Sequence, residues 1–243
     1  FLKGAIFGMS STCSIPDSAR RMARLAGLAY VIYTLAGLYI TFGPIPSLGA
    51  LSEGGAASQP LEFRFRTGLL AETLLYTFVC VSAAAMFAVL RSVSLGAALV
   101  AAFCRLVESA MGATFIVIKY AAFSAALNPA LSEGGGGSVV TLLRDVYGSA
   151  IYFLLVPMAL GGFIFFALFF RSRLIPRWLS GWGMITYLIV GIVASLVVLF
   201  PALKAQVMLF FLPGALFEWV AAVWLLFVGV SPRADHQLSA TRG

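Results

Sequence analysis

The sequence predicts an all-α fold, a polytopic membrane protein built as a bundle of six transmembrane helices with both termini in the cytoplasm. Hydrophobic residues make up 61% of the 243 residues and charged residues only 10%, whereas soluble domains carry about 25% charged residues. Six apolar segments reach the length of about 20 residues that crosses a bilayer. Basic residues are concentrated on one side of these segments, as expected for oriented membrane helices.

The six predicted spans determine the domain organisation. They cover residues 24–43, 69–90, 95–122, 148–170, 178–200 and 207–230. Residues 44–67 and 123–146 are long, glycine-rich connections that we expect to be flexible. We therefore divide the chain into a cytoplasmic N-terminal segment (1–22), a six-helix transmembrane domain (23–230) and a cytoplasmic C-terminal tail (231–243).

The distribution of lysine and arginine predicts the orientation. With the N-terminus in the cytoplasm, ten basic residues lie on the cytoplasmic side and five on the outer side. The ten are Lys3, Arg20, Arg21, Arg24, Arg91, Arg171, Arg173, Arg177, Arg233 and Arg242, and the five are Arg64, Arg66, Lys119, Arg144 and Lys204. This bias favours cytoplasmic termini. The net charge of +7 thus reflects membrane orientation, and we expect no nucleic-acid partner.

Three charged residues lie near the middle of predicted spans. Arg105 and Glu108 fall in the third span and Glu218 in the sixth. A charge at the bilayer midplane costs several kcal/mol unless it is paired or hydrated. Since Arg105 and Glu108 are one helical turn apart, they can pair directly. The three groups sum to −1 with both acids ionised, so we expect one acid to be protonated, or a water or ligand cation to be present. The group either fixes helix register or forms a substrate, lipid or proton site.

A polar stripe continues outward from this pair. Five residues follow one another at intervals of three or four positions: Arg105, Glu108, Gly112, Phe115 and Lys119. This spacing places them on one helix face. With polar groups of other spans, the stripe predicts a dead-end pocket that opens outward, with Gly112 leaving space along it. The candidate ligand or proton site residues are Arg105, Glu108, Glu218, Lys119, Glu72, Asp145 and Trp219.

Prolines and phenylalanines predict further features of the later spans. Pro157 and Pro213 fall within the fourth and sixth predicted spans, where proline kinks a helix. We expect the phenylalanine-rich run 163–170 to contact lipid.

Recognisable catalytic or metal motifs are absent from the sequence. The single histidine, His236, lies in the C-terminal tail, and the three cysteines show no CxxC spacing. These residues do not form a zinc-binding HExxH motif, a haem site within the membrane or a Ser–His pair. We therefore expect no catalytic residues, no metal and no cofactor.

Five segments carry a family resemblance. They are ARLAGLAYVIYTLAG, FRTGLLAETL, CRLVESAMG, LFFRSRLIPRWLSGWG and PGALFEWVAAVWLL. In this order they resemble a bacterial family of six-span membrane proteins catalogued as domain of unknown function four-three-eight-six, over residues 23–229. The resemblance maps the family pattern onto Arg66, Arg105, Glu108, Arg171, Pro176 and Glu218. A histidine expected around the fourth span is absent, and Val156 and Pro157 stand in that region. The resemblance implies a bacterial inner membrane location.

We expect a non-enzymatic integral membrane protein, acting as an accessory or structural subunit or as a membrane-embedded binding module. The alternative is a transporter of protons or a small solute that uses Glu108 and Glu218 with Arg105. A lipid-modifying enzyme is a weaker alternative. The expected partners are membrane lipid and either other membrane subunits or further copies of the chain.

Overall fold

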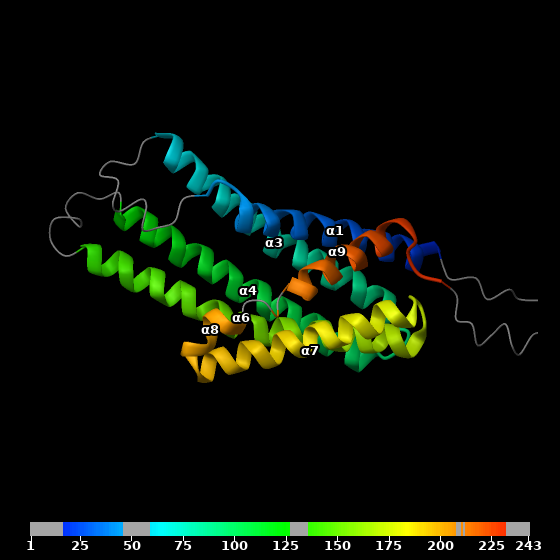
Figure 1. Ribbon diagram of the computed structural model, residues 1–243. Coiled ribbons are helices and arrows are strands. Elements are labelled where there is room, and N and C mark those ends of the chain that lie inside the picture. The colour runs from blue at the N-terminus through cyan, green and yellow to red at the C-terminus, as the bar shows by residue number, and fades with distance from the viewer. Residues whose placement is uncertain (1–16, 46–58, 127–135, 208–209, 211, 232–243) are drawn as a thin grey trace, which may run out of the picture.

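The computed structural model describes residues 17–45, 59–126, 136–207, 210 and 212–231, and its regular elements are all helices (Figure 1). The helices are α1 (Asp17–Phe42), α3 (Gln59–Leu90), α4 (Leu95–Ala126), α6 (Gly136–Ser172), α7 (Arg177–Leu199), the 3-10 helix η1 (Pro201–Leu203), α8 (Lys204–Val207) and α9 (Leu212–Phe227).

The bundle is assembled mainly from neighbours in sequence. The most extensive helix contacts join α4 to α6, α1 to α3, α6 to α7 and α3 to α4, and α9 returns to contact α1. In Figure 1 the start of α1 and the end of α9 lie at the same end of the bundle. The polar clusters described below form where these helices meet.

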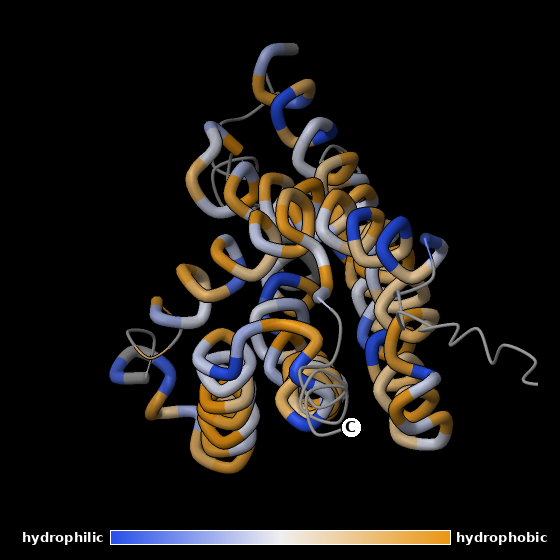
Figure 2. The backbone as a smooth tube through the Cα atoms, turned by 90° about the vertical axis from the view of Figure 1, so that its right-hand side faces the viewer, coloured by the Kyte–Doolittle hydropathy of each residue, from blue (hydrophilic) through white to orange (hydrophobic). Residues whose placement is uncertain are grey.

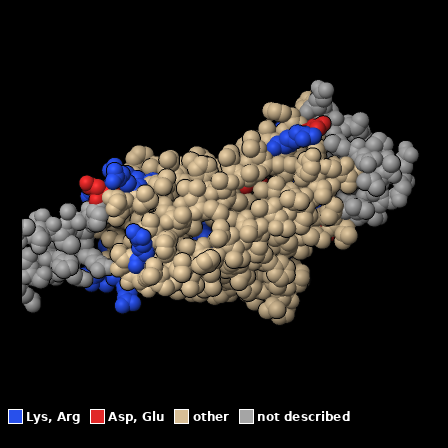
Figure 3. All heavy atoms as spheres, turned by 180° about the vertical axis from the view of Figure 1, so that it is seen from behind, with Lys and Arg blue, Asp and Glu red and all other residues tan. Residues whose placement is uncertain are grey.

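The surface is that of a multi-pass membrane protein. Five of the described helices are long and apolar enough to cross a membrane: Asp17–Phe42, Pro60–Leu90, Leu95–Ala126, Thr141–Ser172 and Arg177–Leu199. Hydrophobic residues cover most of the helical tubes in Figure 2. In Figure 3, charged side chains lie mainly toward the two ends of the molecule, and the wide surface between them is uncharged except for small spots. Such a belt suits contact with lipid tails.

The sixth apolar segment is shorter than predicted. The expected span 207–230 contains α9, which has 16 residues and extends about 24 Å, less than the roughly 30 Å of hydrocarbon in a bilayer. A Cβ added to Gly214 at the start of α9 would lie 3.2 Å from Thr186, near the middle of α7. At the other end Trp224 meets Trp178 at the start of α7. Within the described residues, α9 therefore accompanies one half of α7, and a sixth full crossing stays a prediction.

Parts of the two connections predicted to be flexible are helical, and residues 46–58 and 127–135 of these connections lie outside the described part of the chain. Helix α3 begins at Gln59, α4 continues to Ala126 and α6 begins at Gly136. An ion pair of 2.6 Å between Glu62 and Arg66, one turn apart, supports the start of α3. Phe65 stacks on Phe123 of α4 with 4.5 Å between ring centroids. Local packing outside the apolar spans thus lengthens these helices, against the prediction made from the glycine content.

The structure places both prolines in helices and corrects the expectation for the phenylalanines. Pro157 does lie inside α6, but Pro213 is the second residue of α9. At a helix start the missing N–H of proline costs no hydrogen bond, which suits Pro213 at the second position of α9. Three phenylalanines are almost completely buried in the core, Phe165, Phe166 and Phe169. They do not contact lipid, contrary to the expectation from the sequence.

Candidate functional site

The central ion pair of the site lies on α4. Arg105 Nη1 and Glu108 Oε2 are 2.8 Å apart, and the two side chains are only 7% and 4% exposed. Their three-residue spacing places both on the inward face of the helix. The charges predicted at the midplane therefore form a buried pair within a single helix.

This pair is close in distance but poorly aligned. Neither Arg105 Nη1 nor Glu108 Oε2 makes a well-formed hydrogen bond to any group in the described part of the chain. A buried charged group without satisfied hydrogen bonds is costly in a medium of low dielectric constant. The pair therefore retains unused hydrogen-bonding capacity in the centre of the protein.

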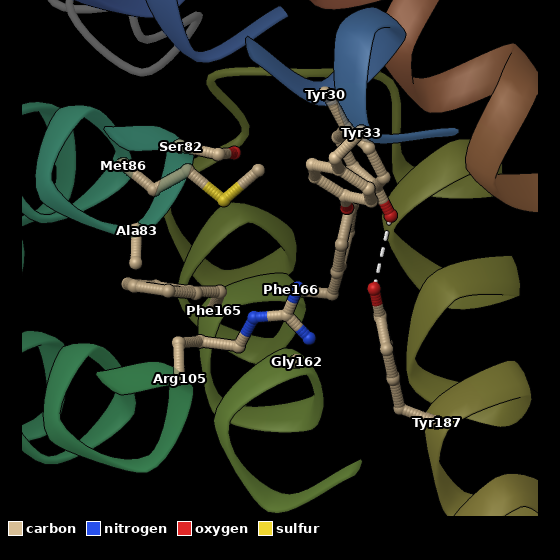
Figure 4. A pocket seen from close by; sticks show the side chains of 10 residues that line it. All are labelled: Tyr30, Tyr33, Ser82, Ala83, Met86, Arg105, Gly162, Phe165, Phe166 and Tyr187. Atoms are coloured by element: carbon tan, nitrogen blue, oxygen red, sulfur yellow. Dashed lines mark hydrogen bonds between the residues drawn. The ribbon is translucent and has the colours of Figure 1, made fainter. Parts of the chain in front are cut away.

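A small cavity adjoins the Arg105 guanidinium (Figure 4). Its free space of about 10 Å³ accommodates about one water molecule. Arg105, Ser82 and three tyrosines supply its polar lining, and aromatic and apolar side chains complete the wall. The lining residues are Tyr30, Tyr33, Ser82, Ala83, Met86, Arg105, Gly162, Phe165, Phe166 and Tyr187. They come from α1, α3, α4, α6 and α7, so the cavity lies where five helices meet.

Two tyrosines connect the cavity to Glu218 of α9. The Tyr30 and Tyr187 hydroxyls are 2.9 Å apart, as the dashed line in Figure 4 shows. The Tyr187 hydroxyl donates a hydrogen bond of 3.3 Å to Glu218 Oε1. Arg105 is also near enough to Glu218 to interact with it electrostatically. The structure thus brings Arg105, Glu108 and Glu218 into one polar group, which we call the inner cluster together with Tyr30, Tyr33 and Tyr187.

Two adjacent glycines of α6 make room for this arrangement. A Cβ at Gly161 would lie 2.9 Å from the Ala101 carbonyl oxygen and 3.1 Å from Arg105 Cγ. A Cβ at Gly162 would lie 2.5 Å from the Tyr187 ring. Small residues let membrane helices approach closely. Here they admit the stem of Arg105 on one side of α6 and Tyr187 on the other.

A second polar group, the outer cluster, lies further along α4. Lys119 forms an ion pair with Glu72 of α3, and the Tyr147 hydroxyl of α6 donates a hydrogen bond of 3.4 Å to the same carboxylate. Lys119 Nζ also lies 4.2 Å from the centre of the Tyr147 ring. These contacts join three helices and give each charged group a partner on another helix.

Aromatic rings separate the two clusters. A Cβ added to Gly112 would lie 2.2 Å from the Tyr76 ring. This ring therefore occupies the space that we expected Gly112 to leave open. Further along α4, the Phe115 ring packs edge-on against Tyr147 with 6.4 Å between centroids. The stripe from Arg105 to Lys119 is one buried face, as predicted, but it is divided at Tyr76 and Phe115.

Comparison with known proteins identifies the family. The family model described as "Domain of unknown function (DUF4386)" matches residues 25–229. The chain belongs to this family. No curated protein and no solved structure matches the chain. The match to DUF4386 includes the residues of both clusters, from Tyr30 to Glu218.

Two predicted site residues lie outside the clusters. Asp145 is 67% exposed and pairs with its neighbour Arg144 at 3.4 Å, so it does not join the outer cluster. Trp219 follows Glu218 on α9 and is half-buried, but it does not line the cavity. Among the described residues, no three His, Cys, Asp or Glu side chains gather in a way that would hold a metal ion.

The tyrosines of the inner cluster were not recognised from the sequence. Each of these tyrosines, Tyr30, Tyr33 and Tyr187, lies within a predicted apolar span, like the charged residues of the inner cluster. All three are buried in the structure. A buried tyrosine hydroxyl needs a hydrogen-bond partner. Their position within predicted spans could therefore have indicated that these tyrosines belong to the site.

Proposed function

We propose that this member of the DUF4386 family is a non-enzymatic integral membrane protein, and that its inner cluster binds a small polar ligand in the middle of the membrane. The observation that carries the proposal is the buried Arg105–Glu108 pair beside a cavity, with Nη1 and Oε2 lacking well-formed hydrogen bonds. A purely structural pair would gain most from full alignment, since burying two charges is repaid only by good geometry and additional hydrogen bonds.

Ligand binding is measurable as stabilisation of the purified protein in detergent. A ligand that binds only the folded state stabilises it by about 2.7 kcal/mol at a hundred times its dissociation constant. We expect one or more members of a panel of small anions, cations and neutral solutes to raise the melting temperature. The increase should disappear in Arg105→Gln.

The matched control is Arg144→Gln, because Arg144 is an exposed arginine whose partner is Asp145. This variant should respond to the panel as the unmodified protein does. If the whole panel leaves the melting temperature unchanged, or if Arg105→Gln keeps the full response, the binding proposal is wrong.

Proton-coupled or small-solute transport is the second candidate, and the hydrogen-bonded series Tyr30–Tyr187–Glu218 favours it. Such a series offers a path between the cavity and a carboxylate on another helix. In this mechanism Glu108 and Glu218 exchange protons and Arg105 is their counter-ion. Proton or solute flux into liposomes should be lost in the double variant Glu108→Gln and Glu218→Gln. Flux that survives both substitutions would exclude this mechanism.

The protein could be an accessory subunit and also have a binding site, because a subunit contact would use the outer surface of the bundle. Large hydrophobic side chains such as Leu188 and Ile192 of α7 are more than half exposed, and they face either lipid or another membrane protein. Purification from native membranes in a mild detergent, followed by identification of co-purifying proteins, distinguishes these two surroundings. We expect a stable partner or a second copy if the chain is a subunit.

A further inference from the structure

We propose that the ligand of the inner cluster is a small monovalent anion that enters together with one proton. The anion replaces Glu108 as the partner of Arg105, and Glu108 accepts the proton. This inference rests on the proposed binding function and specifies the ligand class and its coupling to protons.

The lining of the cavity selects for negative charge. Of the ten residues that line it, Arg105 is the one charged residue, and neither Glu108 nor Glu218 is among them. Figure 4 shows the guanidinium pointing toward the Tyr30 and Tyr187 hydroxyls. Guanidinium and phenol groups both donate hydrogen bonds. A group that accepts hydrogen bonds and carries negative charge therefore matches this lining. A cation in the cavity would face the positive charge of Arg105, and no carboxylate is among the residues that line it.

The volume of the cavity restricts the size of the anion. The free space of about 10 Å³ is close to the minimum that holds one water molecule. A compact anion such as chloride, nitrate or formate therefore needs only a small displacement of neighbouring rings. A large organic anion would have to displace the stacked rings of Tyr30 and Tyr33, which are 4.6 Å apart between centroids.

Charge balance couples anion entry to a proton. Arg105 and Glu108 together are neutral, and arginine remains protonated in proteins. An anion would leave the buried pair with a net charge of −1, and uncompensated charge is strongly unfavourable at low dielectric constant. When Glu108 takes one proton from water, the Arg105–Glu108 ion pair is replaced by an Arg105–anion pair and a neutral carboxylic acid. The number of ionic pairs is unchanged, and the net charge of the inner cluster is the same before and after binding.

Other titratable groups surround Glu108. They are Arg105 on α4, Tyr76 on α3, Tyr187 on α7 and Glu218 on α9, and Tyr30 and Tyr33 of α1 line the cavity beside Arg105. Of the two carboxylates, Glu108 is the direct partner of the guanidinium at 2.8 Å. Glu218 instead accepts a hydrogen bond from Tyr187. Glu108 is therefore the acid that loses its partner when an anion binds.

Proton uptake on anion binding tests this coupling. The purified protein in weakly buffered detergent solution, with a pH indicator, is mixed with sodium chloride, nitrate or formate. Sodium gluconate at equal ionic strength is the control, because gluconate is too large for the cavity. We expect about one proton taken up per protein at saturation with at least one small anion, and none with gluconate. The apparent affinity for the anion should fall about tenfold per pH unit where Glu108 is ionised in the free protein.

Substitutions identify the groups involved. Glu108→Gln should bind the anion, measured by thermal stabilisation, without proton uptake, whereas Asp145→Asn should keep both responses, since Asp145 is an exposed carboxylate outside the clusters. Absence of proton uptake with all three anions, or uptake that persists in Glu108→Gln, would overturn the inference. Stabilisation only by neutral or cationic compounds would show that the anion inference is wrong. If that stabilisation requires Arg105, the proposed binding function still holds.

Discussion

The inner and outer clusters are both buried ion pairs on the same face of α4, yet they are built differently. In the inner cluster, Arg105 and Glu108 belong to one helix and are poorly aligned. In the outer cluster, Lys119 and Glu72 come from two helices, and Tyr147 of a third helix donates to the same carboxylate. The outer pair therefore joins helices, whereas the inner pair cannot, because both its members move with α4.

This difference predicts a structural role for the outer pair and supports the binding role proposed for the inner pair. A pair between helices contributes to stability only while the helices remain in register, so its loss is felt throughout the bundle. A pair within one helix can open without separating helices, and its groups are free to exchange partners. Outer-cluster substitutions should therefore reduce stability most, and inner-cluster substitutions should change ligand and proton binding more than stability.

The largest effect is expected from Lys119→Met. Breaking a buried pair by removal of one partner costs about 3–5 kcal/mol, and Lys119 and Glu72 are only 15% and 7% exposed. We expect a loss of this size in the free energy of unfolding, measured in bicelles by denaturant titration. Because similarly sized uncharged side chains replace a buried pair at little cost, Glu72→Gln combined with Lys119→Met should recover most of it. A double variant as unstable as the single one would contradict the structural role of the outer pair.

A smaller effect is expected from Gly27→Ala at the contact of α1 with α9. The new Cβ would lie 2.3 Å from the Leu226 backbone nitrogen, and overpacking of this kind costs about 1–3 kcal/mol. Moving α9 away also moves Glu218, so the response to ligand should weaken. Gly96→Ala is the matched control, since nothing lies within 4 Å of its added Cβ. Equal unfolding free energies for the two variants would show that the close α1–α9 contact is not required.

Tyr187→Phe should lower stability by about 1 kcal/mol. It removes the hydroxyl contacts to Tyr30 and Glu218 but keeps a ring to pack against Phe166. Hydrogen bonds between membrane helices contribute about 0.6 kcal/mol on average. Tyr39→Phe is the control, because its hydroxyl contact to Thr67 is exposed, and it should leave the unfolding free energy unchanged. If both variants lose the same amount, burial does not distinguish the inner hydroxyls.

The fold was predictable as far as it depends on apolar length. The spans containing Arg105 and Tyr187 were located within a few residues, since burial in lipid requires about 20 apolar residues per crossing, whereas α1, which contains Tyr30, begins at Asp17 and not at residue 24. The ends were not, because the start of α3 depends on local contacts such as Glu62–Arg66 and Phe65–Phe123. Apolar length alone could not predict that α9, the helix described in the sixth segment, would have 16 residues.

The site was predictable in part for a similar reason. Helical spacing places Arg105, Glu108 and Lys119 on one face of α4, and this follows from the sequence of a single segment. The partners of these groups depend on how helices are arranged, which is why Tyr187 was missed and why Asp145, expected beside the outer charges, pairs instead with Arg144. Gly112 was expected to leave open space, but the length of Tyr76 on the neighbouring helix fills it.

The smallest effect is expected from Asp145→Asn, which tests whether the outer cluster ends before Asp145. Asp145 lies near the outer cluster in sequence, two residues before Tyr147, but its side chain is 67% exposed and pairs only loosely with Arg144 at 3.4 Å. Exposed ion pairs contribute little because water screens both charges. The melting temperature and the proton uptake on anion binding should both equal those of the unmodified protein. A clear loss of stability would mean that the outer cluster extends to Asp145 and that its boundary at Tyr147 is drawn too narrowly.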